Sequence, residues 1–229
     1  MISVSWSLTR QDHGEQPFWM AIMLASMIGQ IGLPGGGFGF GYSATNHIGG
    51  QFTILPGAAF PQAKNEIENF IPVARISDLL LKPNENFNFD GKKYKYPDTK
   101  IVYWAGGNPF HHHQDLNRLI KAWEKPDTII CNEWCWNTLA KRSDIVLPCT
   151  TPLERKDIMM TPRDPYVVSM SKLVDPYGQA RNDYEIFTGI AKKMGVEKKF
   201  TENRNQEEWQ EWIYNQTFDR ACLLYTSPS

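Results

Sequence analysis

The pattern of apolar and polar residues predicts alternating strands and helices in the second half of the chain. Short apolar runs typical of buried strands occupy residues 101–105, 128–131 and 144–147. Helical stretches of residues 114–124 and 138–142 separate them. This order predicts an α/β fold, a doubly wound Rossmann-like parallel sheet with helices on both faces.

Two further elements follow these strands. Residues 166–174 alternate in polarity like an additional strand, and residues 183–194 have a helical pattern. Asn182 precedes that helix as an N-cap, and Gly195 follows it as a C-terminal stop.

The first 69 residues have a different pattern. Pro17 begins a helix with apolar side chains on every face, and a glycine-rich stretch, residues 32–41, follows it. A helix that is apolar all round must be covered by neighbours, so we expect it to be buried. Its apolar stretch, residues 18–31, is interrupted by polar residues and glycine and is too short for a membrane span. The remaining residues up to 69 show no sustained period and are expected to form long loops.

These changes predict four parts of the chain. Residues 1–69 form a truncated segment of a neighbouring domain, residues 70–199 the Rossmann-like domain, and residues 200–220 a terminal helix. Residues 221–229 follow that helix abruptly and are expected to be a non-native tail, with a genuine short loop as the alternative. No signal peptide is visible at the first residue, and the chain begins as though inside a domain.

The composition of the chain excludes some classes of function. With 229 residues and 41% apolar residues, the chain can bury a core and is expected to be globular. Its formal charge of -1 offers no broad basic face for nucleic acid. The four cysteines contain no CxxC pair and indicate neither a zinc site nor a disulfide framework. We expect Cys131 and Cys135 to be buried packing residues.

Polar groups follow each predicted strand of the sheet, where ligands of parallel sheets bind. Gly106, Gly107 and Asn108 follow the first strand, and the glycines allow the backbone to approach a phosphate. Asn132 and Glu133 follow the second strand, and residues 150–155 follow the third. From the residues alone, a nucleotide site and an ordinary Asn-Pro turn both remain open.

Two other kinds of site are disfavoured. The three consecutive histidines, residues 111–113, cannot all face one metal from a single backbone. The glycine-rich residues 32–41 follow a helix and lack the lysine of a Walker loop.

Several motifs together resemble a known family. In chain order they are residues 5–10 (SWSLTR), 13–16 (HGEQ), 29–39 (GQIGLPGGGFG), 106–114 (GGNPFHHHQ), 144–148 (DIVLP), 154–155 (ER) and 179–183 (QARND). The chain resembles, from about residue 3 to residue 218, the dimethyl sulfoxide reductase family of bacterial molybdenum enzymes. Within it, the branch of S- and N-oxide reductases is the most similar, which makes the chain an internal fragment of such an enzyme.

The resemblance implies a bis(molybdopterin guanine dinucleotide) molybdenum cofactor (Mo-bis-MGD). It also implies that nine residues contact this cofactor, and that the guanine edge donates two hydrogen bonds to the Asp183 carboxylate. The nine residues are Trp6, Ser7, Arg10, Asn108, His112, Asn132, Glu133, Arg155 and Asp183. The resemblance also implies that the serine that ligates molybdenum in this branch lies upstream of Met1, so no residue of the chain is assigned as catalytic or as a metal ligand.

Two positions depart from the family. The family more often has aspartate where this chain has Glu133, and residues 159–164 look shortened, which puts the neighbouring loop in doubt.

The resemblance further implies reduction of a sulfoxide or amine N-oxide substrate, with electrons from a cytochrome or small redox protein. We expect no nucleic acid partner and no membrane span. The fragment alone is expected to be inactive, and the parent enzyme to be periplasmic, with a cytoplasmic location as the alternative. A formate dehydrogenase or nitrate reductase relative and a non-catalytic guanine-nucleotide-binding module are the rival functions.

Overall fold

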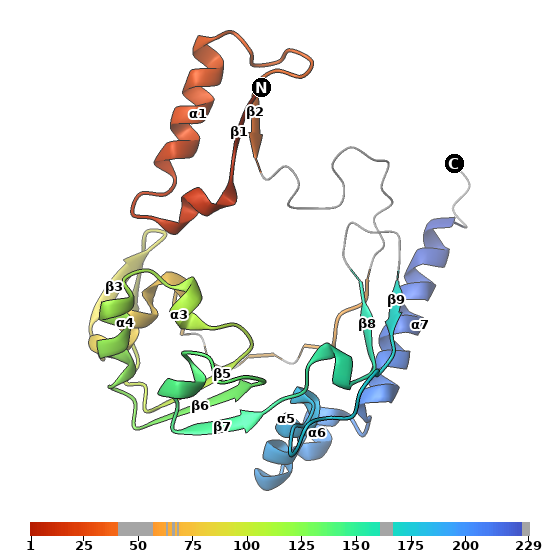
Figure 1. The fold of residues 1–229 in the computed structure, drawn as a ribbon. Helices are drawn as coiled ribbons and strands as arrows, with labels where there is room; N and C mark the ends of the chain where they lie inside the picture. Colours follow the sequence, from red (N-terminus) through yellow and green to blue (C-terminus); the bar gives the residue numbers. More distant parts are fainter. Residues whose placement is uncertain (41–56, 63, 66, 68, 161–166, 226–229) are drawn as a thin grey trace. The chain divides into compact units, whose positions relative to one another are not determined.

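The computed structural model describes residues 1–40, 57–62, 64, 65, 67, 69–160 and 167–225. It divides into two compact units, which we describe separately (Figure 1). Unit 1 consists of Met1–Gly57 and Met160–Val167, and unit 2 of Ala58–Met159 and Val168–Ser229.

The described part of unit 1 contains one α-helix beside a pair of short parallel strands. The strands β1 (Ile2–Val4) and β2 (Phe38–Phe40) pair in parallel, with Ile2 opposite Phe38. The 3-10 helix η1 (Trp6–Arg10) leads to α1 (Gln16–Met27), which has Pro17 in its first turn as the sequence predicted. The strand β2 lies inside the glycine-rich stretch of residues 32–41, where the sequence predicted no strand.

The expectation that α1 is buried is wrong within its own unit. Among its side chains only Ala21 and Ala25 are buried. Large apolar side chains such as Met20 and Met23 are 66% and 57% exposed. Unit 1 by itself therefore buries little of this helix.

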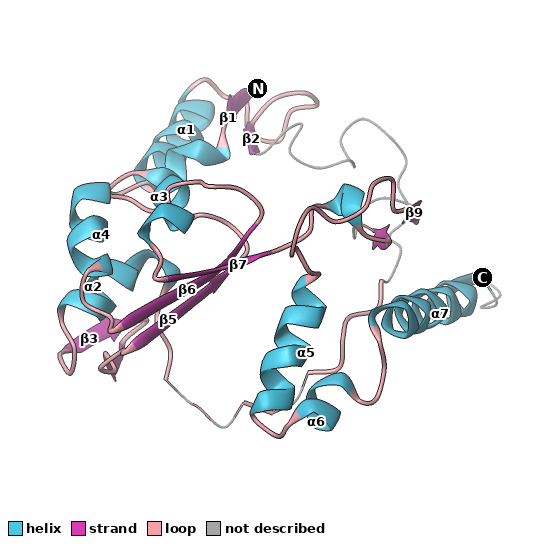
Figure 2. Ribbon diagram, turned by 60° about the horizontal axis from the view of Figure 1, so that its bottom comes forward, coloured by secondary structure: helices cyan, strands magenta, loops and turns pink. Residues whose placement is uncertain are grey.

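The centre of unit 2 is a three-stranded parallel sheet in the order β5-β6-β7 (Figure 2). Its strands are β5 (Ile101–Ala105), β6 (Thr128–Glu133) and β7 (Ile145–Pro148). The helix α4 (Leu116–Trp123) connects β5 to β6, which confirms the predicted βαβ unit. Asp115 caps α4 by accepting a hydrogen bond from the backbone N–H of Arg118.

Helices lie on both faces of this sheet. On one face, Trp104 of β5 contacts Trp123 of α4, with 5.7 Å between ring centroids, inside a core that includes Leu119 and Cys131. On the other face, Tyr103 contacts Phe187 of the helix α5 (Asp183–Lys193) at 5.3 Å. Because neighbouring strand residues point to opposite faces, the two contacts place helices on both sides, as predicted for the α/β class.

Unit 2 contains further elements. They are η2 (Val73–Arg75), α2 (Ile76–Leu81), β3 (Asn86–Phe89), β4 (Lys92–Lys95), α3 (Pro109–His112), η3 (Ala140–Arg142), η4 (Pro152–Glu154), β8 (Asp157–Met159), β9 (Val168–Met170), α6 (Glu197–Thr201) and α7 (Gln206–Tyr225). The antiparallel hairpin β3–β4 was not expected from the sequence. The predicted additional strand is β9, which pairs antiparallel with β8 outside the parallel sheet. The terminal helix α7 continues to Tyr225, beyond the predicted end of the native chain.

Three smaller expectations can also be compared with the structure. Cys131 is buried as expected, whereas Cys135 is exposed, so the second packing prediction is wrong. Asn182 caps α5 through a reciprocal capping box with Glu185. Among the described helices, none combines the length and apolar character that crossing a membrane requires.

Candidate functional site

The loop after β5 combines an open backbone with an unsatisfied polar group. Gly106 and Gly107 adopt φ angles of 82° and 71°, in the left-handed region that favours glycine. A side chain added at Gly106 would meet no atom within 4 Å, so the space in front of this backbone is open. At Gly107 the nearest atoms belong to the His112 ring, at 3.9 Å. The loop can therefore receive a group that approaches the backbone closely.

Asn108 lies at the start of α3 and is only 6% exposed. Its Oδ1 accepts a hydrogen bond of 3.0 Å from the backbone N–H of Phe110, which caps the helix. Its Nδ2 is buried and has no hydrogen-bond partner among the described residues. A buried amide without a partner is unfavourable by about 1–3 kcal/mol, so this donor is available for a ligand oxygen.

The end of β6 contributes two buried polar side chains, Asn132 and Glu133, which are 3% and 8% exposed. Asn132 lies opposite Ala105 in the sheet, so the two loops emerge from the same edge. In the described part of the chain, we find no hydrogen bond or ion pair to the Glu133 carboxylate. A carboxylate in this position can accept hydrogen bonds from hydroxyl groups of a bound sugar.

Asn132 connects β5 to the start of α5. Its Oδ1 accepts a hydrogen bond from the Tyr103 hydroxyl, and its Nδ2 donates one to Asp183 Oδ1, both at 2.8 Å. One oxygen of Asp183 is thus already used within the protein. The carboxylate still has lone pairs for a ligand donor, because it can accept about four hydrogen bonds.

The segment after β7 is fixed by contacts with residues 181 and 182. Cys149 and Arg181 form an isolated parallel bridge, and the Thr150 hydroxyl donates to Asn182 Oδ1 at 2.7 Å. Arg155 donates from its guanidinium to the Thr150 carbonyl oxygen at 2.8 Å and from Nε to Asp157 at 3.0 Å. Arg155 also lines a pocket of about 360 Å³.

Charged groups of this site meet around Cys149. The pKa of its thiol is raised to about 11, first by burial and then by the carboxylates of Asp183 and Glu133, while Arg155 lowers it. These three charged side chains are therefore close enough to act electrostatically on one sulfur atom.

The structure brings together six of the nine predicted contact residues at the carboxyl edge of the sheet in unit 2. They are Asn108, His112, Asn132, Glu133, Arg155 and Asp183. Trp6, Ser7 and Arg10 lie in η1 of unit 1. In that unit Ser7 donates from its backbone N–H and its hydroxyl to Ser5 Oγ, at 3.3 Å and 3.0 Å. The involvement of all nine residues in cofactor binding stays a prediction.

Sequence reasoning missed the roles of two residues that organise the site. Tyr103 holds Asn132, and burial, the largest influence, raises the pKa of its hydroxyl. Thr150 is 4% exposed and holds Asn182. A signal for Tyr103 was present, because a tyrosine inside an apolar strand needs a partner for its hydroxyl. For Thr150 no such signal existed, since its partner is 32 residues away.

Comparisons with known proteins agree with this geometry. The family model "Molybdopterin oxidoreductase" matches residues 1–193. A biotin sulfoxide reductase of Cereibacter sphaeroides is 48% identical over 221 residues, which is 96% of this chain and 30% of the relative. A trimethylamine-N-oxide reductase of Haemophilus influenzae is 46% identical and a dimethyl sulfoxide/trimethylamine N-oxide reductase of Cereibacter sphaeroides 44%, each over 96% of this chain and 28% of the relative.

A solved structure, acetylene hydratase from Pelobacter acetylenicus, matches at a TM-score of 0.42 and 21% identity, over 51% of this chain and 18% of that chain. The chain spans about 30% of the length of the first curated relative. Because the family model covers most of its residues, the chain belongs to the molybdopterin oxidoreductase family.

Proposed function

We propose that this chain supplies part of the cofactor site of a molybdenum enzyme that reduces S-oxides or N-oxides. Several relatives are named as sulfoxide or N-oxide reductases, and this branch is the one that the chain's motifs resemble. The proposal concerns a protein of the relatives' length, of which this chain is about 30%.

The proposed ligand at the carboxyl edge of the sheet is the guanine dinucleotide form of the cofactor. The single observation that supports it best is the buried Asn108 Nδ2 without a partner, next to the open backbone at Gly106. In this proposal Asn108 and the glycine backbone bind phosphate, and Glu133 accepts from a ribose hydroxyl. Asp183 accepts from the guanine edge with its remaining lone pairs, and Arg155 adds positive charge.

The cofactor, when bound, supplies the chemistry that converts an S- or N-oxide, two electrons and two protons into a sulfide or amine and water. The residues of this chain bind and orient it. Trp6, Ser7 and Arg10 are proposed to contact the same cofactor from unit 1. The electron donor is proposed to be a cytochrome or small redox protein, and the location periplasmic.

Substitution of Asp183 tests this proposal in the protein of full length. Asp183→Ala should lower the guanine nucleotide released from the purified protein by acid, together with its molybdenum content. Asp98→Ala is the control and should retain both, because Asp98 pairs with Lys100 before the start of β5, at the end of the strand away from the site. Unchanged guanine and molybdenum in the Asp183→Ala protein would contradict the assignment of the site.

A further inference from the structure

Unit 1 contains a pocket that the cofactor site does not use. It has a volume of about 600 Å³ and is lined by Thr9, Gln11, Asp12, His13, Gly14, Glu15, Phe18 and Phe38. All of these residues lie in unit 1, and five of them come from the turn between η1 and α1. We call it the His13 pocket.

The turn that lines the His13 pocket is held in one conformation. Gly14 packs so closely that a Cβ there would lie 2.7 Å from the Leu8 carbonyl oxygen. His13 has a φ angle of 50°, and its carbonyl oxygen accepts from the backbone N–H of Gln16 at 3.0 Å. The pocket is therefore formed before any ligand binds, which reduces the entropy lost on binding.

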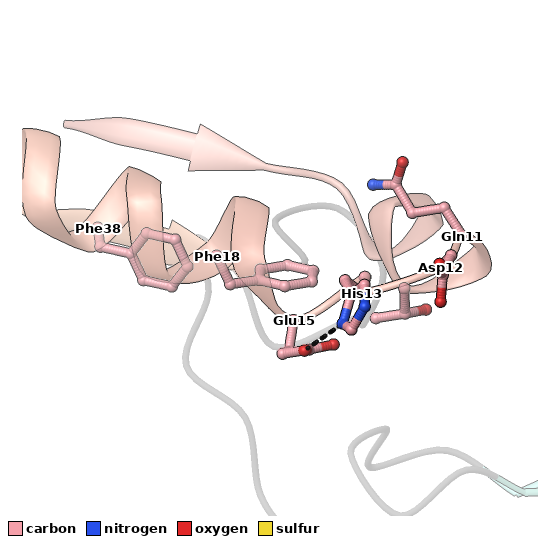
Figure 3. A pocket seen from close by; sticks show the side chains of 8 residues that line it. Gln11, Asp12, His13, Glu15, Phe18 and Phe38 are labelled. Atoms are coloured by element: carbon pink, nitrogen blue, oxygen red, sulfur yellow. Dashed lines mark ion pairs between the residues drawn. The ribbon is translucent and has the colours of Figure 1, made fainter.

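The lining combines aromatic rings with negative charge. Figure 3 shows the phenyl rings of Phe18 and Phe38 and the His13 imidazole in one row. The Glu15 carboxylate lies 3.5 Å from His13 Nδ1, and Asp12 brings a second carboxylate to the same pocket. Arg10, the nearest cation along the sequence, is not among the lining residues.

Aromatic faces and carboxylates together favour one class of ligand. The face of a phenyl ring attracts a cation, and its apolar surface also accepts methyl groups. The carboxylates attract a cation electrostatically, even when the cation carries no hydrogen-bond donor. A methylated ammonium group satisfies all of these features, whereas dimethyl sulfoxide has fewer methyl groups and only a partial positive charge on sulfur, so it gains less from the lining.

We propose that the His13 pocket binds the methylated ammonium group of an amine N-oxide. Its positively charged nitrogen and methyl groups lie against Phe18 and Phe38, near Asp12 and Glu15. Its oxygen accepts a hydrogen bond from His13. The assignment to an N-oxide substrate rests on the proposed function, but the binding itself requires neither molybdenum nor turnover.

A helix start also favours carboxylates when no ligand is present, because the helix dipole stabilises them. The experiment must therefore test the aromatic residues as well as the acidic ones. The 229-residue chain, labelled with ¹⁵N, is titrated with tetramethylammonium, trimethylamine N-oxide and dimethyl sulfoxide, and amide shifts are followed by NMR. We expect the first two ligands to shift the amides of residues 9–15 at millimolar concentration, and dimethyl sulfoxide to leave them in place.

Three variants identify the pocket. Phe18→Leu and Asp12→Asn should each raise the Kd for tetramethylammonium about three-fold. Trp19→Leu removes an exposed aromatic ring from the same helix outside the pocket lining, and it should leave the Kd unchanged. Unchanged spectra away from the substituted residue verify that each variant is folded. High salt should weaken binding, because the carboxylates are exposed.

Three results would overturn the proposal. Equal shifts with dimethyl sulfoxide would show an apolar hollow without selectivity for charge. A Phe18→Leu chain that binds as well as the unaltered chain would remove the aromatic contribution. Binding of tetramethylammonium without binding of trimethylamine N-oxide would overturn the assignment to an N-oxide. None of these results bears on guanine retention through Asp183, so failure of this proposal can be told from failure of the proposed function.

Discussion

The hydrogen bond between Asn132 and Asp183 gives a prediction of definite sign and size. Asn132 is 3% exposed, and its Nδ2 lies 2.8 Å from Asp183 Oδ1. The substitution Asn132→Asp keeps the shape of the side chain but replaces this donor by a carboxylate. Even if the two carboxylates relax to about 4 Å, their repulsion is about 4 kcal/mol at an effective dielectric constant of about 20.

The variant can avoid this repulsion by sharing one proton between the two carboxylates. Protonating a carboxyl group of ordinary pKa costs about 4 kcal/mol at pH 7 and about 1.5 kcal/mol at pH 5. Sharing raises the pKa of the folded pair above its unfolded value, so the folded state binds the extra proton and stability falls as pH rises. Asn132→Asp should therefore lower the free energy of unfolding by about 4 kcal/mol at pH 7 and by about 1.5 kcal/mol at pH 5.

Urea denaturation followed by circular dichroism measures this loss. With a slope of about 2 kcal/mol per molar urea, the midpoint should move by about 2 M at pH 7. The double variant Asn132→Asp with Asp183→Asn exchanges donor and acceptor and should recover most of the loss at both pH values. A loss below about 1 kcal/mol at pH 7, or an equal loss at pH 5 and pH 7, would refute the hydrogen bond.

Two further predictions concern single positions. In α5, no atom lies within 4 Å of a Cβ added at Gly189. Gly189→Ala should therefore raise the free energy of unfolding by about 0.5–1 kcal/mol in the same urea assay. A loss of stability would contradict the open surroundings of this residue. The pKa of the Cys149 thiol is raised from 9.0 to about 11. Because the thiolate is the form that reacts, alkylation of Cys149 by iodoacetamide at pH 8 should be about 100-fold slower than that of an ordinary thiol. The exposed Cys135 should react readily. Mass spectrometry of the labelled peptides measures both rates, and equal rates would exclude the partly buried environment of Cys149.

The sequence predicted the parallel sheet well because its signals are local. The residues of β5 and β6 are apolar runs bounded by polar residues, and α5 begins with a capping residue and ends near Gly195. The short pairs β1–β2 and β3–β4 were missed, since strands of three or four residues leave almost no periodic pattern.

The candidate site was predictable as a set of residue types but not as a network. The position of Asn132 and Glu133 at a strand end indicated ligand binding. The bond from Asn132 to Asp183, however, joins residues 51 positions apart, and no local pattern indicates such a partner. Burial of α1 was predicted wrongly for unit 1, because an apolar pattern indicates that a helix face needs cover but not what covers it.

The contacts of residues 149 and 150 with residues 181 and 182 have a consequence for folding. They close a loop of about thirty residues, and loop closure costs entropy before any contact stabilises it. The pairing of β6 with β7 joins residues about half as far apart in sequence, such as Ile130 and Ile145, and should form earlier. A chain shortened before Asn182 should therefore keep the pairing of β6 with β7 while lacking Asp183, and we expect the proposed nucleotide end of the site to be assembled last.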